Sequence, residues 1–413
     1  MSPAGATADV LVVGGGILGC SAAWHLTRLC PTARIVVLER HGSVATQASS
    51  QAAALLTRAR PGAVVVMPLV ARTFAAMDEL ADELAQPLPL HRNGTLHAAG
   101  SAAAVGEQQA LAATCAEHGL RAESLDLAEA CRLVPWLNAA AVRSALLMPD
   151  DAFIDPYLLA DAYARAARRR GARFRFGTEV TSINVEADRV TGVATAEGEL
   201  HAPVVVLAAG TWANRLAAPL GAGLPMAPVR SQYWLTETDP LFPRAHPAVL
   251  LPEARAYTRP ELGALLFGVR EPASISVDPA ALPADTSGYA FADDPDGWAS
   301  LEEGAPSLRR FLPALDRVAI RRYVAGFSTY TPDSLFVIGE MPGTRGLFVA
   351  SGCCGAGIAA SGGFGEAVAS LVAGETPPFD LAPFHPGRFG PVDPSAPAFR
   401  ASCAAARSRK TAG

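Results

Sequence analysis

The feature that most constrains the fold is a glycine-rich turn close to the N-terminus. Residues 9–13 (DVLVV) are a short apolar run, and residues 14–19 (GGGILG) follow directly. Apolar residues then recur at helical spacing, so the pattern predicts a strand, a tight turn and a helix. Glycine lets backbone N–H groups approach a pyrophosphate, and the helix N-terminus carries roughly half a positive charge. The sequence therefore predicts dinucleotide contacts at Gly14, Gly16, Ile17, Leu18 and Gly19.

The segment after this helix completes a strand-helix-strand unit. Residues 34–38 (RIVVL) read as a second buried strand, and Glu39 stands at its end. A carboxylate at this position can accept both hydrogen bonds of a ribose diol and argues against a 2′-phosphate, although Arg40 beside it weakens that argument. We therefore interpret the unit as a binding site for FAD or NAD, with Glu39 and Arg40 as further contacts, rather than as a tight turn without a ligand.

Composition excludes several classes of function. Charged residues make up 18% of the chain and the net charge is -5 without a block of like charge, so we expect no nucleic-acid partner. Lys410 is the only lysine, which excludes Schiff-base catalysis by a lysine of the folded body. No run approaches the roughly 18 apolar residues that span a bilayer and no signal peptide is recognisable, which predicts a cytoplasmic location without a membrane span. Seven cysteines without a His/Cys ligand pattern predict no metal site.

The remaining segments predict two discontinuous domains and a tail. Two further apolar runs, 203–207 and 347–350, each lead into a turn of small residues, as the first strand does. We assign to a cofactor-binding domain the residues 8–84, 151–224 and 321–376. We assign to a second domain, which covers the cofactor, the residues 85–150 and 225–320. Residues 377–413 are a Pro/Ala-rich C-terminal extension, and we expect its last dozen or so residues to be mobile and without function.

Several motifs, in order, resemble one enzyme family. They are DVLVVGGGILGCSAAWHL with IVVLER, SSQAAALLTR (49–58), VVLAAGTWANRL (205–216), AGFSTYTPDSLFVIG (325–339) and GLFVASGCCGAGIAASGGFGEAVA (346–369). Over most of residues 8–375 the chain resembles the FAD-dependent D-amino acid oxidase superfamily, most closely its glycine oxidase, sarcosine and dimethylglycine dehydrogenase branch. The resemblance implies FAD rather than NAD. It also implies an α/β fold, with a Rossmann-like FAD-binding domain of the GR2/DAO type and a discontinuous antiparallel-sheet α+β substrate domain.

The resemblance implies further FAD contacts outside the first turn. Residues that match the family segment along the pyrophosphate and flavin are Ser49, Ser50, Gln51 and Ala52. Residues that match the adenine contact and the turn closing over the dinucleotide are Val180, Ala209, Gly210 and Trp212. Residues that match the loop at the flavin's pyrimidine end are Gly355, Ala356, Gly357 and Ile358. Relatives that attach flavin covalently use a histidine in place of Gln51 or a cysteine in place of Gly326, so we predict non-covalent FAD.

The substrate side departs from the family pattern. Several relatives bind the substrate carboxylate with an arginine where this chain has Ser328, and some use a lysine near the flavin that we expect this chain not to supply. The anchor for the carboxylate, and the choice between oxidase and dehydrogenase, therefore stay open. The candidate anchors are Arg58, Arg230, Arg259 and Arg270. For any one of them, an ordinary structural or solvent-exposed role is the more common alternative. Candidates for an aromatic wall around an amine are Tyr233, Trp234, Tyr257 and Tyr330. The predicted catalytic residues are Tyr257, Tyr330, Arg259 and Ser328.

The predicted reaction is oxidation of a C–N bond in an amino acid or N-alkyl amine, with hydride transfer to flavin N5 and hydrolysis of the imine. A helix expected from about Ile358 to Ala373 would stabilise the reduced flavin. Two alternatives stay open: a 2-hydroxy acid oxidase or dehydrogenase, which needs a base such as His91, and a non-catalytic flavin-binding redox module. The expected partners are a small amine or amino acid and either O2 or an electron-transfer acceptor.

Overall fold

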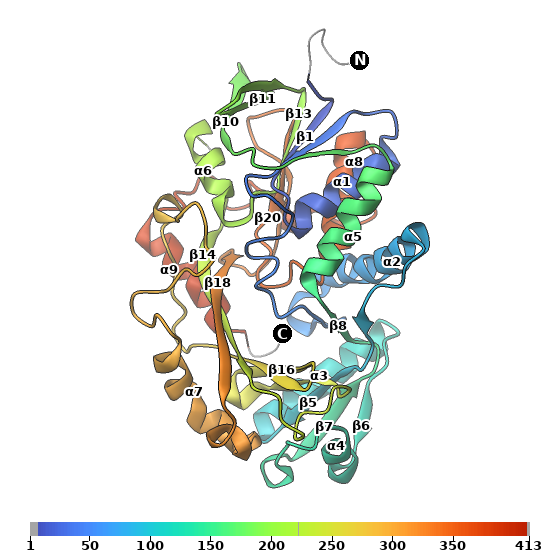
Figure 1. Cartoon of the computed structure of the whole chain (residues 1–413), viewed down its shortest axis with the longest axis vertical. Coiled ribbons are helices and arrows are strands. Elements are labelled where there is room, and N and C mark those ends of the chain that lie inside the picture. Colours follow the sequence, from blue (N-terminus) through green and yellow to red (C-terminus); the bar gives the residue numbers. More distant parts are fainter. Residues whose placement is uncertain (1–6, 222, 411–413) are drawn as a thin grey trace.

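A six-stranded sheet forms the centre of the upper lobe in Figure 1. The computed structural model describes residues 7–221 and 223–410 of the 413-residue chain. In sheet order the strands are β19 (Val337–Glu340), β20 (Leu347–Ser351), β13 (Val204–Leu207), β1 (Val10–Val13), β2 (Ile35–Leu38) and β9 (Arg173–Arg175). All neighbours are parallel except β19 and β20. The four central strands consist almost wholly of apolar residues because both faces of a parallel sheet are covered.

Helices cover one face of this sheet. Helices α1 (Ile17–Leu29) and α8 (Ser361–Ala373) pack on its strands, and α5 (Pro156–Arg169) and α2 (Met67–Leu84) pack on these two helices. Helices α1 and α8 approach closely at Gly365. The approach leaves no room for a side chain there, since an added Cβ atom would lie only 2.3 Å from Ser21 Oγ and 2.5 Å from His25 Nδ1. Helix α8 begins at Ser361, later than the predicted start near Ile358, because residues 357–360 form turns. The loop that precedes α8 is therefore not helical.

A small antiparallel sheet covers the opposite face. It contains β10 (Val180–Glu186), β11 (Arg189–Thr195) and β12 (Gly198–His201), and the short helix α6 (Ala213–Ala217) lies beside it. Ile183 and Val193 share one apolar cluster with Leu11 and Val205 of the central sheet. The central sheet is thus the middle of three layers.

A second large sheet forms the wall of the lower lobe. Its order is β18 (Ile320–Tyr330), β14 (Ala227–Thr236), β17 (Ala264–Val269), β16 (Ala256–Glu261), β15 (Ala248–Leu251), β5 (Thr95–Ala99), β7 (Ser144–Met148) and β6 (Glu123–Leu125). All pairs are antiparallel except β15 with β5. The helices of this lobe are α3 (Ala102–Glu117), α4 (Leu127–Leu133) and α7 (Trp298–Phe311). Trp234, Phe267 and Phe311 lie at the centre of its core.

The two lobes share connecting strands. A three-stranded sheet of β3 (Leu55–Leu56), β8 (Ala152–Ile154) and β4 (Leu90–His91) forms where the chain passes between them. All six strands of the central sheet lie in the segments assigned to the cofactor-binding domain. Strand β18 was assigned to that domain too, yet it pairs with β14 over nearly its whole length, from Ala227 opposite Tyr330 onward. The domain boundaries themselves stay a prediction.

The C-terminal extension ends in a packed helix. Helix α9 (Pro397–Ser408) lies against β14 and β18, and its Cys403 and Ala404 are buried in a cluster with Tyr330. The expectation of a mobile tail is therefore wrong for its described residues, because the small apolar side chains there form a helix face that packs on the sheet. Residues 411–413 of the extension lie outside the described residues.

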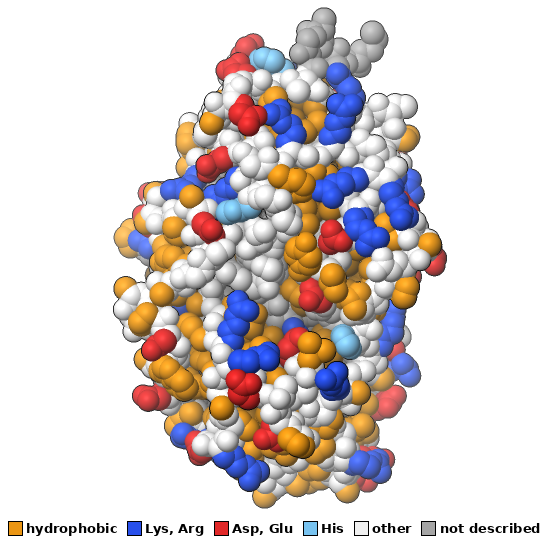
Figure 2. Space-filling model, viewed as in Figure 1, with side chains coloured by type: hydrophobic (Ala, Val, Ile, Leu, Met, Phe, Trp, Pro, Cys, Tyr) orange, Lys and Arg blue, Asp and Glu red, His pale blue; other side chains and the backbone are white. Residues whose placement is uncertain are grey.

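The described residues contain neither a membrane-spanning helix nor a cluster of metal-ligating side chains. No helix within residues 7–221 and 223–410 is long and apolar enough to cross a membrane. The same residues contain no group of three or more His, Cys, Asp or Glu side chains arranged to hold a metal ion. Charged side chains of both signs are scattered over the face in Figure 2. The face shown therefore has no large patch of one sign.

The contact between α1 and α8 can be tested by adding one methyl group. We expect Gly365→Ala to lower the free energy of unfolding by about 1–3 kcal/mol, because its Cβ has no room beside Ser21 and His25. Gly106→Ala in α3 is the matched control: nothing lies within 4 Å of its added Cβ, so it should gain up to about 1 kcal/mol. Urea unfolding of both variants gives the comparison. Equal stability of Gly365→Ala and the unsubstituted protein would contradict the packing described.

Candidate functional site

One long pocket runs between the two lobes. Residues of the N-terminal glycine turn, of segments 39–41 and 45–55, and of the 208–212 turn line its upper part. Strands β14 and β18 and the 353–359 loop line its lower part, together with side chains from elsewhere in the chain: Arg60, Tyr257, Arg270, Arg407 and Lys410. The glycine turn and the second lobe therefore face a common space.

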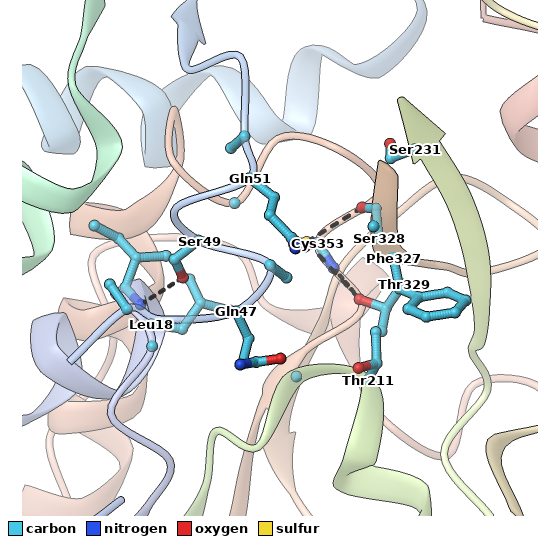
Figure 3. A pocket seen from close by; sticks show the side chains of 18 of the residues that line it. Leu18, Gln47, Ser49, Gln51, Thr211, Ser231, Phe327, Ser328, Thr329 and Cys353 are labelled. Carbon is cyan, nitrogen blue, oxygen red and sulfur yellow. Dashed lines mark hydrogen bonds between the residues drawn. The ribbon is translucent and has the colours of Figure 1, made fainter. Parts of the chain in front are cut away.

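The glycine turn is sterically closed to side chains. A Cβ added at Gly14, where φ is +108°, would lie 2.6 Å from Ala208 O, and one added at Gly19 would lie 1.9 Å from Gly14 O. Only glycine lets α1 approach its strand this closely. The first amide of α1, Ile17 N, donates to Ser49 Oγ at 3.0 Å, as Figure 3 shows. Gly14, Gly16, Ile17 and Leu18 line the pocket, whereas Gly19 packs behind it.

The carboxylate of Glu39 is fixed beside this turn. Its two oxygens accept hydrogen bonds from Gly15 N at 2.7 Å and from His41 N at 2.9 Å. Each oxygen keeps a second lone pair for another donor. The Arg40 guanidinium lies 3.9 Å from the centre of the Trp212 ring, and Val180 lines the same end. These positions agree with a ribose and adenine end of the pocket.

Gln51 and Gly326 meet at the other end. Gln51 Oε1 is buried and has no hydrogen-bond partner among the described residues, and a Cβ added at Gly326 would lie 2.2 Å from it. Figure 3 shows Gln51 extending from its segment toward Ser328 and Cys353. Thr211 Oγ1 and Gln232 Nε2 are likewise buried without a partner in the described part of the chain, and both residues line the pocket. Such polar atoms call for a ligand with its own donors and acceptors.

The 353–359 loop is tied to strand β18. Gly355 N donates to Ser328 Oγ at 3.1 Å, and Cys354 N donates to Thr329 O at 2.8 Å. Ser328 Oγ and Cys353 Sγ lie 3.8 Å apart. Cys354 adopts φ of +48° and Gly355 φ of +75°, so the backbone is sharply turned here. Gly355, Gly357 and Ile358 line the pocket; Ala356 is buried behind them.

Three tyrosines from the second lobe complete the wall: Tyr233, Tyr257 and Tyr330. The Tyr257 ring lies over Gly268, where an added Cβ would be 2.3 Å from the ring. Burial raises the pKa of Tyr257, and it raises the pKa of Tyr330 to about 12. Both phenols are therefore neutral near pH 7 and can donate a hydrogen bond to a ligand.

The structure separates the candidate arginines. Arg270 lines the pocket near the Tyr257 ring. Arg259 does not; its Nε donates to Ala53 O at 2.7 Å, and its guanidinium pairs with Glu261. Arg230 is buried in ion pairs with Glu271 and Asp293, and Arg58 stacks on Phe74 outside the pocket. Trp234 likewise packs in the core of the second lobe.

Sequence reasoning missed four cations of the lining: Arg60, Arg215, Arg407 and Lys410. Arg60 lies two residues beyond the motif that ends at Arg58, and its place in the lining depends on the fold of the loop. Arg407 and Lys410 come from the extension that was expected to have no function. The expectation that the chain supplies no lysine to this region is wrong, because its only lysine lies in the pocket lining. The presence of a single lysine in the chain was the one feature of the sequence that could have drawn attention to Lys410.

The candidate histidine base lies elsewhere. His91 stacks on Phe153, with ring centres 4.6 Å apart, and does not line the pocket. His97 is buried in β5, and burial lowers its pKa to about 4. Among the described lining residues the only histidine is His41, next to Glu39.

Comparison with known proteins decides the family. The model of the FAD dependent oxidoreductase family, DAO, matches residues 9–371. The chain belongs to the FAD dependent oxidoreductase family. It is 30% identical over 391 residues to mitochondrial dimethylglycine dehydrogenase of Mus musculus, covering 93% of this chain and 44% of that protein. It is 29% identical over 392 residues to mitochondrial sarcosine dehydrogenase of Homo sapiens, covering 94% and 42%. The chain thus spans less than half the length of these curated relatives.

A solved structure supports the same placement. Glycine oxidase from Geobacillus kaustophilus superposes with a TM-score of 0.77 at 27% identity, covering 93% of this chain and 99% of that chain. The predicted family branch, the fold class and FAD as the cofactor are thereby confirmed. Helix α9 and Lys410 lie beyond the part that the DAO model matches.

The residues of the pocket fit FAD. The closed glycine turn leaves room for a pyrophosphate beside the first amides of α1, and Glu39 stands at the ribose position. The unpartnered Gln51 Oε1 and the polar atoms near it suit the polar edge of a flavin ring. Position 51 is glutamine and position 326 is glycine, so this chain has neither the histidine nor the cysteine expected at these positions for covalent attachment of flavin. Of the predicted contacts, Gly19, Ser50 and Ala356 do not line this pocket, and the roles of the others stay predictions.

The role of Glu39 can be measured directly. We expect Glu39→Gln to weaken FAD binding by roughly tenfold or more, because a charge-assisted hydrogen bond contributes about 1.5–3 kcal/mol. Glu199→Gln removes the same charge from the exposed surface of β12 and should leave FAD binding unchanged. Titration of FAD into the FAD-free form of each variant, followed by flavin fluorescence, checks this. An unchanged dissociation constant for Glu39→Gln would place the ribose elsewhere.

Proposed function

We propose that this protein oxidises a C–N bond of an amino acid or N-alkyl amine, with FAD as the electron acceptor. The observation that carries the proposal is the single pocket that joins Glu39 and the glycine turn to the tyrosines and cations of the second lobe. A dinucleotide at one end and a small amine at the other would then meet at Gln51, Ser328 and the 353–359 loop. Bound FAD supplies a two-electron acceptor. The polypeptide supplies the rest by binding, orientation and exclusion of water.

The names of the relatives support an amine that also carries a carboxylate. They include dimethylglycine and sarcosine dehydrogenases, and a 4-methylaminobutanoate oxidase (formaldehyde-forming) of Paenarthrobacter nicotinovorans that is 29% identical to this chain. Each named compound joins a methylated amine to a carboxylate. We propose the same class here. Loss of hydride from a carbon attached to the nitrogen of a neutral amine would leave an iminium ion, and addition of water would convert that ion to a carbonyl compound and an amine with release of a proton.

The tyrosines suit an amine in its neutral form. Tyr233, Tyr257 and Tyr330 place three rings around the lower part of the pocket, and their phenols stay protonated near pH 7. A buried, apolar surrounding disfavours an ammonium ion and so assists loss of its proton before oxidation. Ser328, already bonded to Gly355 N, can accept or donate one further hydrogen bond. We propose that these four residues position the amine.

The 2-hydroxy acid alternative lacks the histidine base expected for it. Removal of a hydroxyl proton requires an acceptor within hydrogen-bond reach, and neither His91 nor His97 lines the pocket. A role as a non-catalytic flavin-binding module gains no specific support. The electron acceptor that reoxidises the flavin, O2 or a redox partner, follows from the experiment below.

The proposal predicts that amines bleach the bound flavin in the absence of air. The FAD-loaded protein is titrated with sarcosine, N,N-dimethylglycine and 4-methylaminobutanoate, and in parallel with glycolate and lactate. We expect loss of the visible flavin absorption band with at least one amine, formation of a carbonyl product, and no change with the hydroxy acids. Admission of air then distinguishes an oxidase from a dehydrogenase. Bleaching by hydroxy acids alone, or by no compound of a wide amine panel, would contradict the proposal.

A further inference from the structure

The C-terminal extension brings two cations to the pocket: Arg407, which is paired with Glu271, and Lys410. We propose that Lys410, held there by helix α9, binds the carboxylate of the substrate and determines the preference for amines that carry one. The identity of the substrate as an amine rests on the function proposed above. Binding of acetate tests the role of Lys410 as an anion-binding residue independently of that function.

The lysine lies at the corner formed by the 353–359 loop and β18. Its Nζ donates to Cys354 O at 2.6 Å and lies 5.7 Å from the centre of the Tyr330 ring. A Cβ added at Gly355 would be 3.7 Å from the same Nζ. Gly355 N in turn donates to Ser328 Oγ. An ammonium group has three N–H donors, so two remain for a ligand in the pocket.

Helix α9 is anchored firmly enough to hold this position. Arg407 Nη1 donates to Glu271 Oε2 at 2.7 Å and to Ser274 Oγ at 2.8 Å, and the Arg407 and Glu271 side chains are each only 4% exposed. Ser408 Oγ accepts from Ser274 N at 2.8 Å, and Ser408 O accepts from Arg255. The last turn of α9 is therefore bonded to the loop that follows β17 and to Arg255, the residue before β16. Lys410 follows it by two residues, so its backbone is closely confined.

The charges around Lys410 favour an anion. Arg60 and Arg270 line the same pocket and repel its ammonium group. The acids of the neighbourhood are engaged otherwise: Glu271 binds Arg230 and Arg407, and the buried Asp151 faces Arg60 and Arg58. A carboxylate placed among these three cations would offset their mutual repulsion and accept charge-assisted hydrogen bonds.

The protonation of Lys410 gives the site a pH dependence. Burial and the neighbouring Arg60 and Arg270 lower the pKa of Lys410 to about 7. The other groups that face it are the thiols of Cys353 and Cys354 and the Tyr330 phenol, and burial keeps the pKa of Cys354 near 11. The ammonium form is present below pH 7, so carboxylate binding should be strongest there and weaken as pH rises through about 7. Burial also raises the pKa of Asp151 to about 7, so its ionisation near Arg60 adds to the same trend.

The test compares four FAD-loaded full-length proteins: the unsubstituted chain, Lys410→Met, Lys410→Arg and Arg409→Met. Arg409 is the matched control because its exposed side chain donates to Pro332 O and does not line the pocket. Binding of acetate, with acetamide as the neutral probe, is followed by the change in flavin absorption from about pH 6 to pH 9. The KM and kcat for an active amine and for its methyl ester are then compared. FAD content and thermal midpoint show whether each variant is folded.

We expect Lys410→Met to weaken acetate binding, and to raise KM for the carboxylate amine, by about tenfold or more below pH 7. Acetamide, the ester and kcat should change little. Lys410→Arg should restore acetate binding and leave only the smaller pH dependence that Asp151 contributes. Arg409→Met should match the unsubstituted chain.

Three results would overturn the inference. They are acetate binding in folded Lys410→Met equal to that of the unsubstituted chain, equal losses for the carboxylate amine and its ester, and an Arg409→Met defect as large as that of Lys410→Met. Failure of every amine to reduce the unsubstituted protein would instead remove the proposed function. The acetate titration would still decide the role of Lys410 in that case.

Discussion

The close approach of helix α1 to the central sheet is the constraint on which the site depends. Side chains are excluded at Gly14 and Gly19, where an added Cβ would collide with backbone carbonyl oxygens. That exclusion brings the first amides of α1 to the head of the pocket and places Glu39, at the end of β2, beside them. The second lobe contributes nothing to this geometry. It adds a wall of tyrosines and cations, and strand β18 brings Gly326 and Ser328 to the flavin end of the pocket.

Local patterns in the sequence were enough to predict the cofactor lobe. The runs at 10–13, 35–38 and 204–207 are short, apolar and followed by glycine or small residues, and each forms a buried strand. Such signals depend only on neighbours in the chain. The start of α8 was misplaced because Gly355 and Gly357 favour turns over a helix within an otherwise apolar segment. Strands β18 and β14 pair through residues about a hundred positions apart. The local periodicity of the sequence could not predict this pairing.

The substrate side was predicted less well, because its residues meet through long-range contacts. Glu271 joins Arg230 to Arg407 across more than a hundred positions, which makes Arg230 structural and fixes the end of α9. Composition alone made the extension look like a disordered tail rich in alanine, serine and arginine. Its apolar face becomes evident only when Cys403 and Ala404 pack beside Tyr330. Arg259, a plausible anchor by its place in the sequence, is turned away by its bond to Ala53 O.

The central claim is that FAD lies along the pocket between the lobes, with its flavin between Gln51 and the 353–359 loop. A crystal structure of the purified, FAD-loaded protein tests this most directly. We predict the pyrophosphate at the N-terminus of α1, the adenosine ribose on Glu39, and the flavin ring within reach of Gln51 and Ser328. A flavin bound elsewhere, or a pocket closed by side chains in protein that carries FAD, would contradict it.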